Sequence, residues 1–172
     1  MIDSGRRGLF TALSSAVKKS ERGSEETPIA RPPYAPDKSA FQTSCPDCES
    51  KACAQVCEEK IIKIREDGTP ELDFSERGCT FCDACAQACE AGVLSDQTLN
   101  YIDVKVEIDL LKCVAWHDVM CSSCKDPCLE NAIVFLGLFR PEIDMDKCTA
   151  CGWCLHVCPT EAIQLKPRGQ TQ

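Results

Sequence analysis

The chain lacks any long apolar segment. Its longest uninterrupted apolar run, Ala132 to Phe139 with Gly137 inside it, is far shorter than the roughly 18 residues that a membrane-spanning helix needs. The chain also lacks a phosphate-binding loop, an H-E-x-x-H zinc motif and a nucleophile–base constellation. We therefore expect a soluble or peripheral protein that is not an enzyme with bond-making chemistry of its own.

A well-formed export signal is missing too. Arg6-Arg7 and the short apolar stretch after it are similar to a twin-arginine signal, but Ser14, Ser15 and the lysines at 18 and 19 follow without a small-residue cleavage site. Because disulfides form in oxidising compartments, the weak export signal argues against a disulfide scaffold.

Basic residues are scarce beyond the N-terminal tail. The formal net charge is −8, with seven Lys/Arg against five Asp/Glu in residues 1–44 and twelve against twenty-two in residues 45–172. An acidic body is unsuited to binding nucleic acid and suits partners with basic docking surfaces.

The first domain, residues 1–40, is predicted to be an N-terminal amphipathic helix and a flexible linker. Residues 18–40 are rich in proline and charged residues, so they bury little. Before them, apolar residues recur at helical spacing, at Leu9, Ala12, Leu13, Ala16 and Val17. This apolar stripe either packs on the protein's own body or docks on a partner.

Cysteine, by contrast, is abundant, and its sixteen residues fall into four runs. The runs are Cys45-x₂-Cys48-x₄-Cys53-x₃-Cys57, Cys79-x₂-Cys82-x₂-Cys85-x₃-Cys89, Cys113-x₇-Cys121-x₂-Cys124-x₃-Cys128 and Cys148-x₂-Cys151-x₂-Cys154-x₃-Cys158. Each run is followed, five positions after its last cysteine, by a large aliphatic residue, and three runs are preceded by strand-like stretches at 70–74, 106–110 and 141–145. The sequence is therefore a fourfold internal repeat.

The fourth run has the bacterial ferredoxin spacing in full. In that spacing three thiolates bind three irons of one cubane, while the last cysteine, at the start of a helix, points away and serves a neighbouring cluster. The rule predicts four [4Fe–4S] clusters with crossed ligands. The ligand sets are Cys45, Cys48, Cys53 and Cys89 (first set), Cys57, Cys79, Cys82 and Cys85 (second set), Cys113, Cys121, Cys124 and Cys158 (third set), and Cys128, Cys148, Cys151 and Cys154 (fourth set).

Two alternatives concern these sets. Structural zinc also uses Cys-x₂-Cys pairs, but it normally takes two ligands from each of two separated knuckles, not four ligands from eleven to sixteen residues. Seven residues separate Cys113 from Cys121, so the third set is either a complete cluster site or one that binds weakly or through three cysteines. Trp153, inside the fourth run, is expected to shield its cluster from water.

The repeat predicts an α+β fold. We expect a duplicated bacterial 2[4Fe–4S] ferredoxin-like fold with small antiparallel hairpins and short helices, in two domains at 41–100 and 101–172. The first hairpin joins 61–65 to 70–74, and the second joins 133–139 to 142–145.

Several segments resemble the NapF-type ferredoxins of periplasmic nitrate reductase systems. They are Arg6-Arg7-Gly8-Leu9-Phe10, Arg31-Pro32-Pro33-Tyr34, the run from Cys79 to Cys89 and the Cys-x₇-Cys spacing of the third run. The resemblance covers nearly the whole chain. It implies a cytoplasmic protein with four [4Fe–4S] clusters, which associates with the catalytic subunit of the reductase before export and helps to install or reduce its iron–sulfur cluster.

Three functions are therefore hypotheses. The first is a maturation accessory protein that docks on the catalytic subunit of the periplasmic nitrate reductase, in its cytoplasmic precursor form, through the N-terminal helix. The second is an electron-transfer subunit between a dehydrogenase or quinol-oxidising complex and a reductase, with membrane-peripheral redox partners. The third is a non-redox scaffold or chaperone with structural clusters.

Overall fold

The computed structural model describes residues 28–168, which include all sixteen cysteines. The predicted N-terminal amphipathic helix lies outside these residues. Among the described residues, no helix is both long enough and apolar enough to span a membrane.

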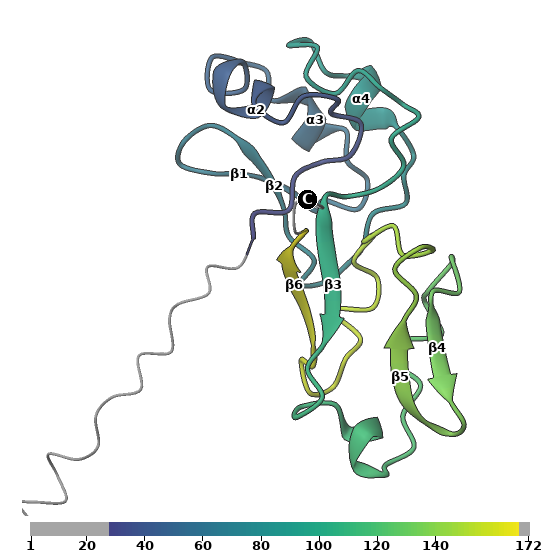
Figure 1. Ribbon diagram of the computed structural model, residues 1–172. Helices are drawn as coiled ribbons and strands as arrows, with labels where there is room; N and C mark the ends of the chain where they lie inside the picture. The colour runs from purple at the N-terminus through teal and green to yellow at the C-terminus, as the bar shows by residue number, and fades with distance from the viewer. Residues whose placement is uncertain (1–27, 169–172) are drawn as a thin grey trace, which may run out of the picture.

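Short elements joined by tight turns make up the described chain (Figure 1). The helices are α2 (Ala40–Thr43), α3 (Ala52–Gln55), α4 (Ala84–Gln87) and the 3₁₀ helix η1 (Val114–His117). The strands are β1 (Ile62–Ile64), β2 (Pro70–Leu72), β3 (Val104–Ile108), β4 (Ile133–Leu136), β5 (Phe139–Ile143) and β6 (Ile163–Pro167).

The strands form three separate antiparallel pairs. The pairs β1–β2 and β4–β5 are the two predicted hairpins, and the prediction of small antiparallel strand pairs with short helices is confirmed. The second hairpin turns earlier than expected, because Gly137 takes a positive φ of 72°. The third pair, β3–β6, was not predicted; it joins the beginning of the second half to its end, with Ile108 opposite Ile163.

One strand is shifted from its predicted position. β3 covers Val104–Ile108, whereas the alternating pattern predicted a strand at 106–110. The chain turns at Asp109, whose backbone N–H donates to the carbonyl of Ala162 at 2.7 Å. Leu110 therefore lies beyond the strand and is 48 % exposed.

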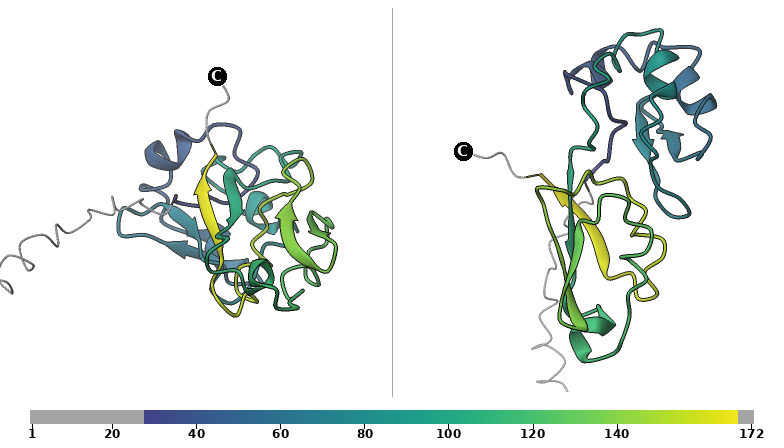
Figure 2. Two further views of the ribbon diagram at one scale, coloured as in Figure 1. Left: turned by 60° about the horizontal axis from the view of Figure 1, so that its bottom comes forward. Right: turned by 90° about the vertical axis from the view of Figure 1, so that its right-hand side faces the viewer.

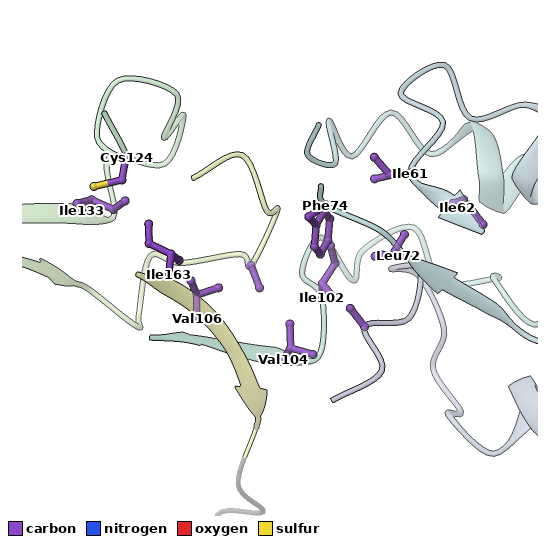
Figure 3. Close-up of a cluster of buried hydrophobic side chains, with 12 residues drawn as sticks. Ile61, Ile62, Leu72, Phe74, Ile102, Val104, Val106, Cys124, Ile133 and Ile163 are labelled. Carbon is purple, nitrogen blue, oxygen red and sulfur yellow. The ribbon is translucent and has the colours of Figure 1, made fainter. Parts of the chain in front are cut away.

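The elements form two halves stacked along the long axis of the molecule, one with α2, α3, α4, β1 and β2 and one with β3 to β6 (Figures 1 and 2). A single apolar cluster runs through both, and Phe74 and Ile102 lie between its two ends (Figure 3). The backbone N–H of Ile102 also donates to the carbonyl of Thr149 at 2.9 Å. The halves are therefore packed together, while the exact domain boundaries stay a prediction.

One buried polar side chain fastens the start of the described chain to the first hairpin. Thr69 is only 2 % exposed. Its hydroxyl donates to a carboxylate oxygen of Asp67 at 2.6 Å and accepts from the guanidinium of Arg31 at 2.6 Å. Arg31 also donates to the carbonyl of Pro70, so Thr69 holds both a cation and an anion in place.

We predict that Thr69→Val destabilises the protein by about 1–3 kcal/mol, because it leaves buried hydrogen-bonding groups without a partner. The control is Thr98→Val, which removes the same kind of hydroxyl bond, to Asp96 at 2.6 Å, on an exposed loop without an arginine. Anaerobic urea unfolding measures both variants. Equal shifts of the two midpoints would contradict a special role for Thr69.

Candidate metal centres

The structure brings the sixteen cysteines together in four groups, and all are free thiols. Each group takes three cysteines from one run and the last cysteine of another. Three groups line separate cavities: Cys57, Cys79, Cys82 and Cys85; Cys128, Cys148, Cys151 and Cys154; and Cys113, Cys121, Cys124 and Cys158. In the remaining group, which is the first set, the thiols of Cys45, Cys48 and Cys89 are the neighbours of Cys53. These memberships are those of the four sets defined from the sequence.

The three cavities resemble one another in size and lining. Their volumes, counted with their open mouths, are about 430 Å³ for the second set, 350 Å³ for the third and 370 Å³ for the fourth. Aliphatic side chains complete their walls, such as Leu72 in the second, Ile108 in the third and Val106 in the fourth. Three similar cavities, each with four thiols, fit a bound group of one kind.

A tight turn follows the last cysteine of every run and directs it toward the other set. The residue three positions later donates its backbone N–H to the carbonyl of that cysteine, at 3.0 to 3.2 Å, and has a positive φ. These residues are Lys60, Gly92, Asn131 and Glu161. The predicted helix start at the last cysteine is wrong, because a left-handed residue in this position ends the turn instead of continuing it.

The same turns point backbone donors at three of these sulfur atoms. Leu94 donates to Cys89 at 3.4 Å, and the alanines at 132 and 162 donate to Cys128 at 3.3 Å and Cys158 at 3.2 Å. Burial pushes the pKa of Cys158 upward, but the N–H donors outweigh it and leave the pKa below its ordinary value. Hydrogen bonds to ligand sulfurs are one of the levers that set cluster potentials.

The third cysteine of each run is the one whose charge is most strongly disfavoured. Burial raises the pKa of Cys53 to about 11, of Cys85 to about 12 and of Cys124 to about 11, and it raises the pKa of Cys154 well above its usual range. Neighbouring thiols of the same set raise each pKa further. Because metal ligation requires thiolates, such a set becomes charged only around a cation, which a metal cluster supplies.

A lysine side chain lies beside the first set. The first run has four residues between Cys48 and Cys53, where the other runs have two, and one of the four, Lys51, has a positive φ of 44°. The ammonium of Lys51 donates to the carbonyl of Cys45 at 2.5 Å and to that of Gly68 at 2.8 Å. Burial still raises the pKa of Cys45, and the charge of Lys51 opposes the increase.

The long gap in the third run is filled by a compact turn. η1 occupies it, and Asp118, with a positive φ of 60°, ends η1. The indole N–H of Trp116 donates to the carbonyl of Pro141 at 3.2 Å and anchors this turn to β5. Cys113 therefore lines the same cavity as the other three cysteines of its set.

Trp153 has a contact that the sequence did not reveal. Its indole N–H donates to the carbonyl of Cys79 at 3.1 Å, across the junction between the two halves. The expected role of Trp153 was to shield the fourth set from water, but its spacing carries no signal for a partner 74 residues away.

Among residues 28–168, no three His, Cys, Asp or Glu side chains are arranged to hold a single metal ion. A cubane is bound in another way, because each thiolate ligates a different iron atom.

Two family models match the chain. A 4Fe–4S dicluster domain matches residues 44–93, which hold the first two runs, and a 4Fe–4S binding domain matches residues 141–164, which hold the fourth. The third run, with its long gap, lies outside both matches. The chain thus has [4Fe–4S]-binding domains in both halves.

Relatives match along almost the whole chain. The ferredoxin-type protein NapF of Escherichia coli (strain K12) is 34 % identical over 166 residues, which are 94 % of this chain and 94 % of that protein. NapF of Haemophilus influenzae is 31 % identical over 171 residues, 96 % of this chain and 93 % of that protein. The ferredoxin-type protein NapG of Escherichia coli is 28 % identical over 161 residues, 79 % of this chain and 68 % of that protein. The chain therefore belongs to the NapF family of ferredoxin-type iron–sulfur proteins.

Proposed function

We propose that each of the four sets binds one [4Fe–4S] cluster, and that the protein is a cytoplasmic accessory protein in the maturation of the catalytic subunit of a periplasmic nitrate reductase. The observation that carries the proposal is the grouping of all sixteen cysteines into four crossed sets within a NapF-family chain.

The residues around each set suit cluster binding. When bound, a [4Fe–4S] cluster stores and releases one electron at a time. The chain supplies four thiolates, aliphatic walls that exclude water and backbone N–H groups that stabilise charge on sulfur. Each of these features is one by which proteins tune the potential of a cluster.

Iron content distinguishes crossed sets from uncrossed runs. We predict about sixteen irons per chain for the intact protein, and a loss of about four in Cys57→Ala and in Cys82→Ala. The double variant of these two residues, which belong to one set, also loses about four.

The matched double variant, Cys48→Ala with Cys57→Ala, changes two cysteines of one run that belong to different sets. It is expected to lose about eight irons, measured by anaerobic iron and sulfide analysis. A loss of only about four in this variant would show that the runs bind clusters without exchanging cysteines.

A segment that resembles the NapF-type ferredoxins forms part of the second set's surroundings. Tyr34, from the Arg-Pro-Pro-Tyr segment, is 1 % exposed and lines the cavity that holds the second set. Its carbonyl accepts the backbone N–H groups of Ser95 and Asp96 at 3.0 and 2.9 Å. This family-like segment is therefore tied to a cysteine set, which supports carrying the family's accessory role to this chain.

The accessory role predicts binding to the immature partner. We expect the full chain to recover the catalytic subunit that still carries its export signal, and to recover the mature subunit poorly. A variant lacking residues 1–40 tests the tail; equal recovery with this variant would remove the tail from the mechanism. Equal recovery of the precursor and mature subunits would contradict a role before export.

Cell fractionation tests the proposed cytoplasmic location independently. We expect the protein in the cytoplasmic fraction, where the precursor of the catalytic subunit is made. Recovery mainly from the periplasm would overturn this part of the proposal.

An electron-transfer subunit is the second candidate, favoured by the closeness of the second and fourth sets across the junction. Cells that lack the protein distinguish the accessory role from the electron-transfer role. The accessory role predicts a catalytic subunit with an incomplete or inactive cluster, whereas an electron-transfer subunit predicts an intact catalytic subunit that receives no electrons from its respiratory donor.

A further inference from the structure

Two cysteines of different sets touch where the halves of the molecule meet. The backbone N–H of Cys79, in the second set, donates to the carbonyl of Cys151, in the fourth set, at 2.6 Å. The indole N–H of Trp153, a residue of the fourth run, donates back to the carbonyl of Cys79 at 3.1 Å. One short hydrogen bond thus links a residue of one set to a residue of the other.

Glycines allow this close approach from both sides. A Cβ atom at Gly78 would lie 2.5 Å from the ring of Trp153, and a Cβ atom at Gly152 would lie 2.3 Å from the ring of Phe74. Side-chain atoms do not approach this closely, so any larger residue would push the halves apart or displace an aromatic ring. The spacing between Cys79 and Cys151 therefore depends on both glycines.

Neighbouring sets also adjoin inside each half. Cys53 of the first set and Cys85 of the second pack against the same apolar cluster. In the other half, Cys154 of the fourth set packs against the apolar cluster to which Cys124 of the third set belongs. The sets therefore follow one another in the order first, second, fourth, third.

We propose that the Cys79–Cys151 contact is the bridge by which single electrons pass between the two halves, so that the four sets form one continuous row, with Trp153, Gly78 and Gly152 as residues that position the bridge. The inference rests on the proposed binding of clusters by these sets. In each transfer one site loses an electron and its neighbour gains it, with no bond broken and no proton moved. A one-electron protein donor supplies the row and a one-electron protein acceptor drains it.

The order of the row is not the order of the runs along the chain. Electronic coupling falls steeply with distance and is stronger through bonds than through empty space. A transfer from the second set to the fourth therefore uses the direct hydrogen bond, and the third set lies at one end of the row although its run precedes the fourth in sequence.

The test leaves only the second and fourth sets intact in the full-length chain. Cys48→Ala with Cys121→Ala removes one ligand from the first set and one from the third, and about eight irons are expected to remain. In the fully reduced protein, we expect electron paramagnetic resonance to show broadening from the interaction of two paramagnetic clusters. Gly152→Ala added to this background is expected to reduce the broadening without loss of iron.

Gly137→Ala is the matched control. Gly137 has a positive φ of 72°, similar to the 87° of Gly152, but a Cβ atom there meets nothing within 4 Å. The control is expected to keep the broadening. Two clusters that give independent signals in the background variant would overturn the bridge, and unchanged broadening in Gly152→Ala would overturn the role of that glycine.

Failure of the proposed function gives a different result. If the intact chain binds no iron, the cluster sites themselves are wrong. If the ligand replacements empty all four sites, Gly152→Ala and Gly137→Ala are compared in the chain with all sixteen cysteines. After a pulse of one electron per chain, freeze-quenched samples are expected to show slower redistribution between halves in Gly152→Ala, and equal rates would overturn the bridge.

Discussion

Each half of the molecule depends on an exchange of cysteines between its two runs. The last cysteine of a run turns away from its own neighbours and joins the set of the other run, so neither run completes a set alone. The strand pairs accompany this exchange. Three aspartates, Asp73, Asp109 and Asp144, lie at the ends of the strands that precede three of the runs. Each donates its backbone N–H to the carbonyl of the residue four positions after the last cysteine of a run, at 2.8, 2.7 and 2.7 Å. The strands therefore act as short spacers that hold the turning cysteines in place.

The exchange of cysteines also explains how the protein folds with short helices and strands and a small apolar core. In residues 28–168 the helices have four residues and the strands three to five. Many partly buried cysteines pack against the apolar cluster that runs through both halves. Small domains with little apolar burial commonly depend on metals or disulfides for stability. Because buried thiolates are unstable without a cation, cluster binding and folding are expected to be coupled, as in other metal-dependent domains.

Much of this arrangement was predictable from cysteine spacing, because the direction of a ligand depends on a few local residues. The two hairpins and the membership of the four cysteine groups follow from local patterns of this kind. The β3–β6 pair and the link between Cys79 and Trp153 connect residues far apart in sequence, and no local pattern encodes them. The strand before Cys113 was misplaced because alternation continues through Leu110, whereas the backbone already turns at Asp109. The left-handed turns at Lys60 and Glu161 were missed because lysine and glutamate, unlike glycine and asparagine, do not favour a positive φ.

The central claim is that four clusters are bound by crossed ligands in one row. Anomalous diffraction at the iron edge, from crystals of the anaerobically reconstituted protein, tests it most directly. The account predicts four iron sites, each with three cysteines of one run and the last cysteine of its partner run, in the order first, second, fourth, third. Iron sites bound by four cysteines of a single run, or second and fourth sites that do not adjoin, would contradict it.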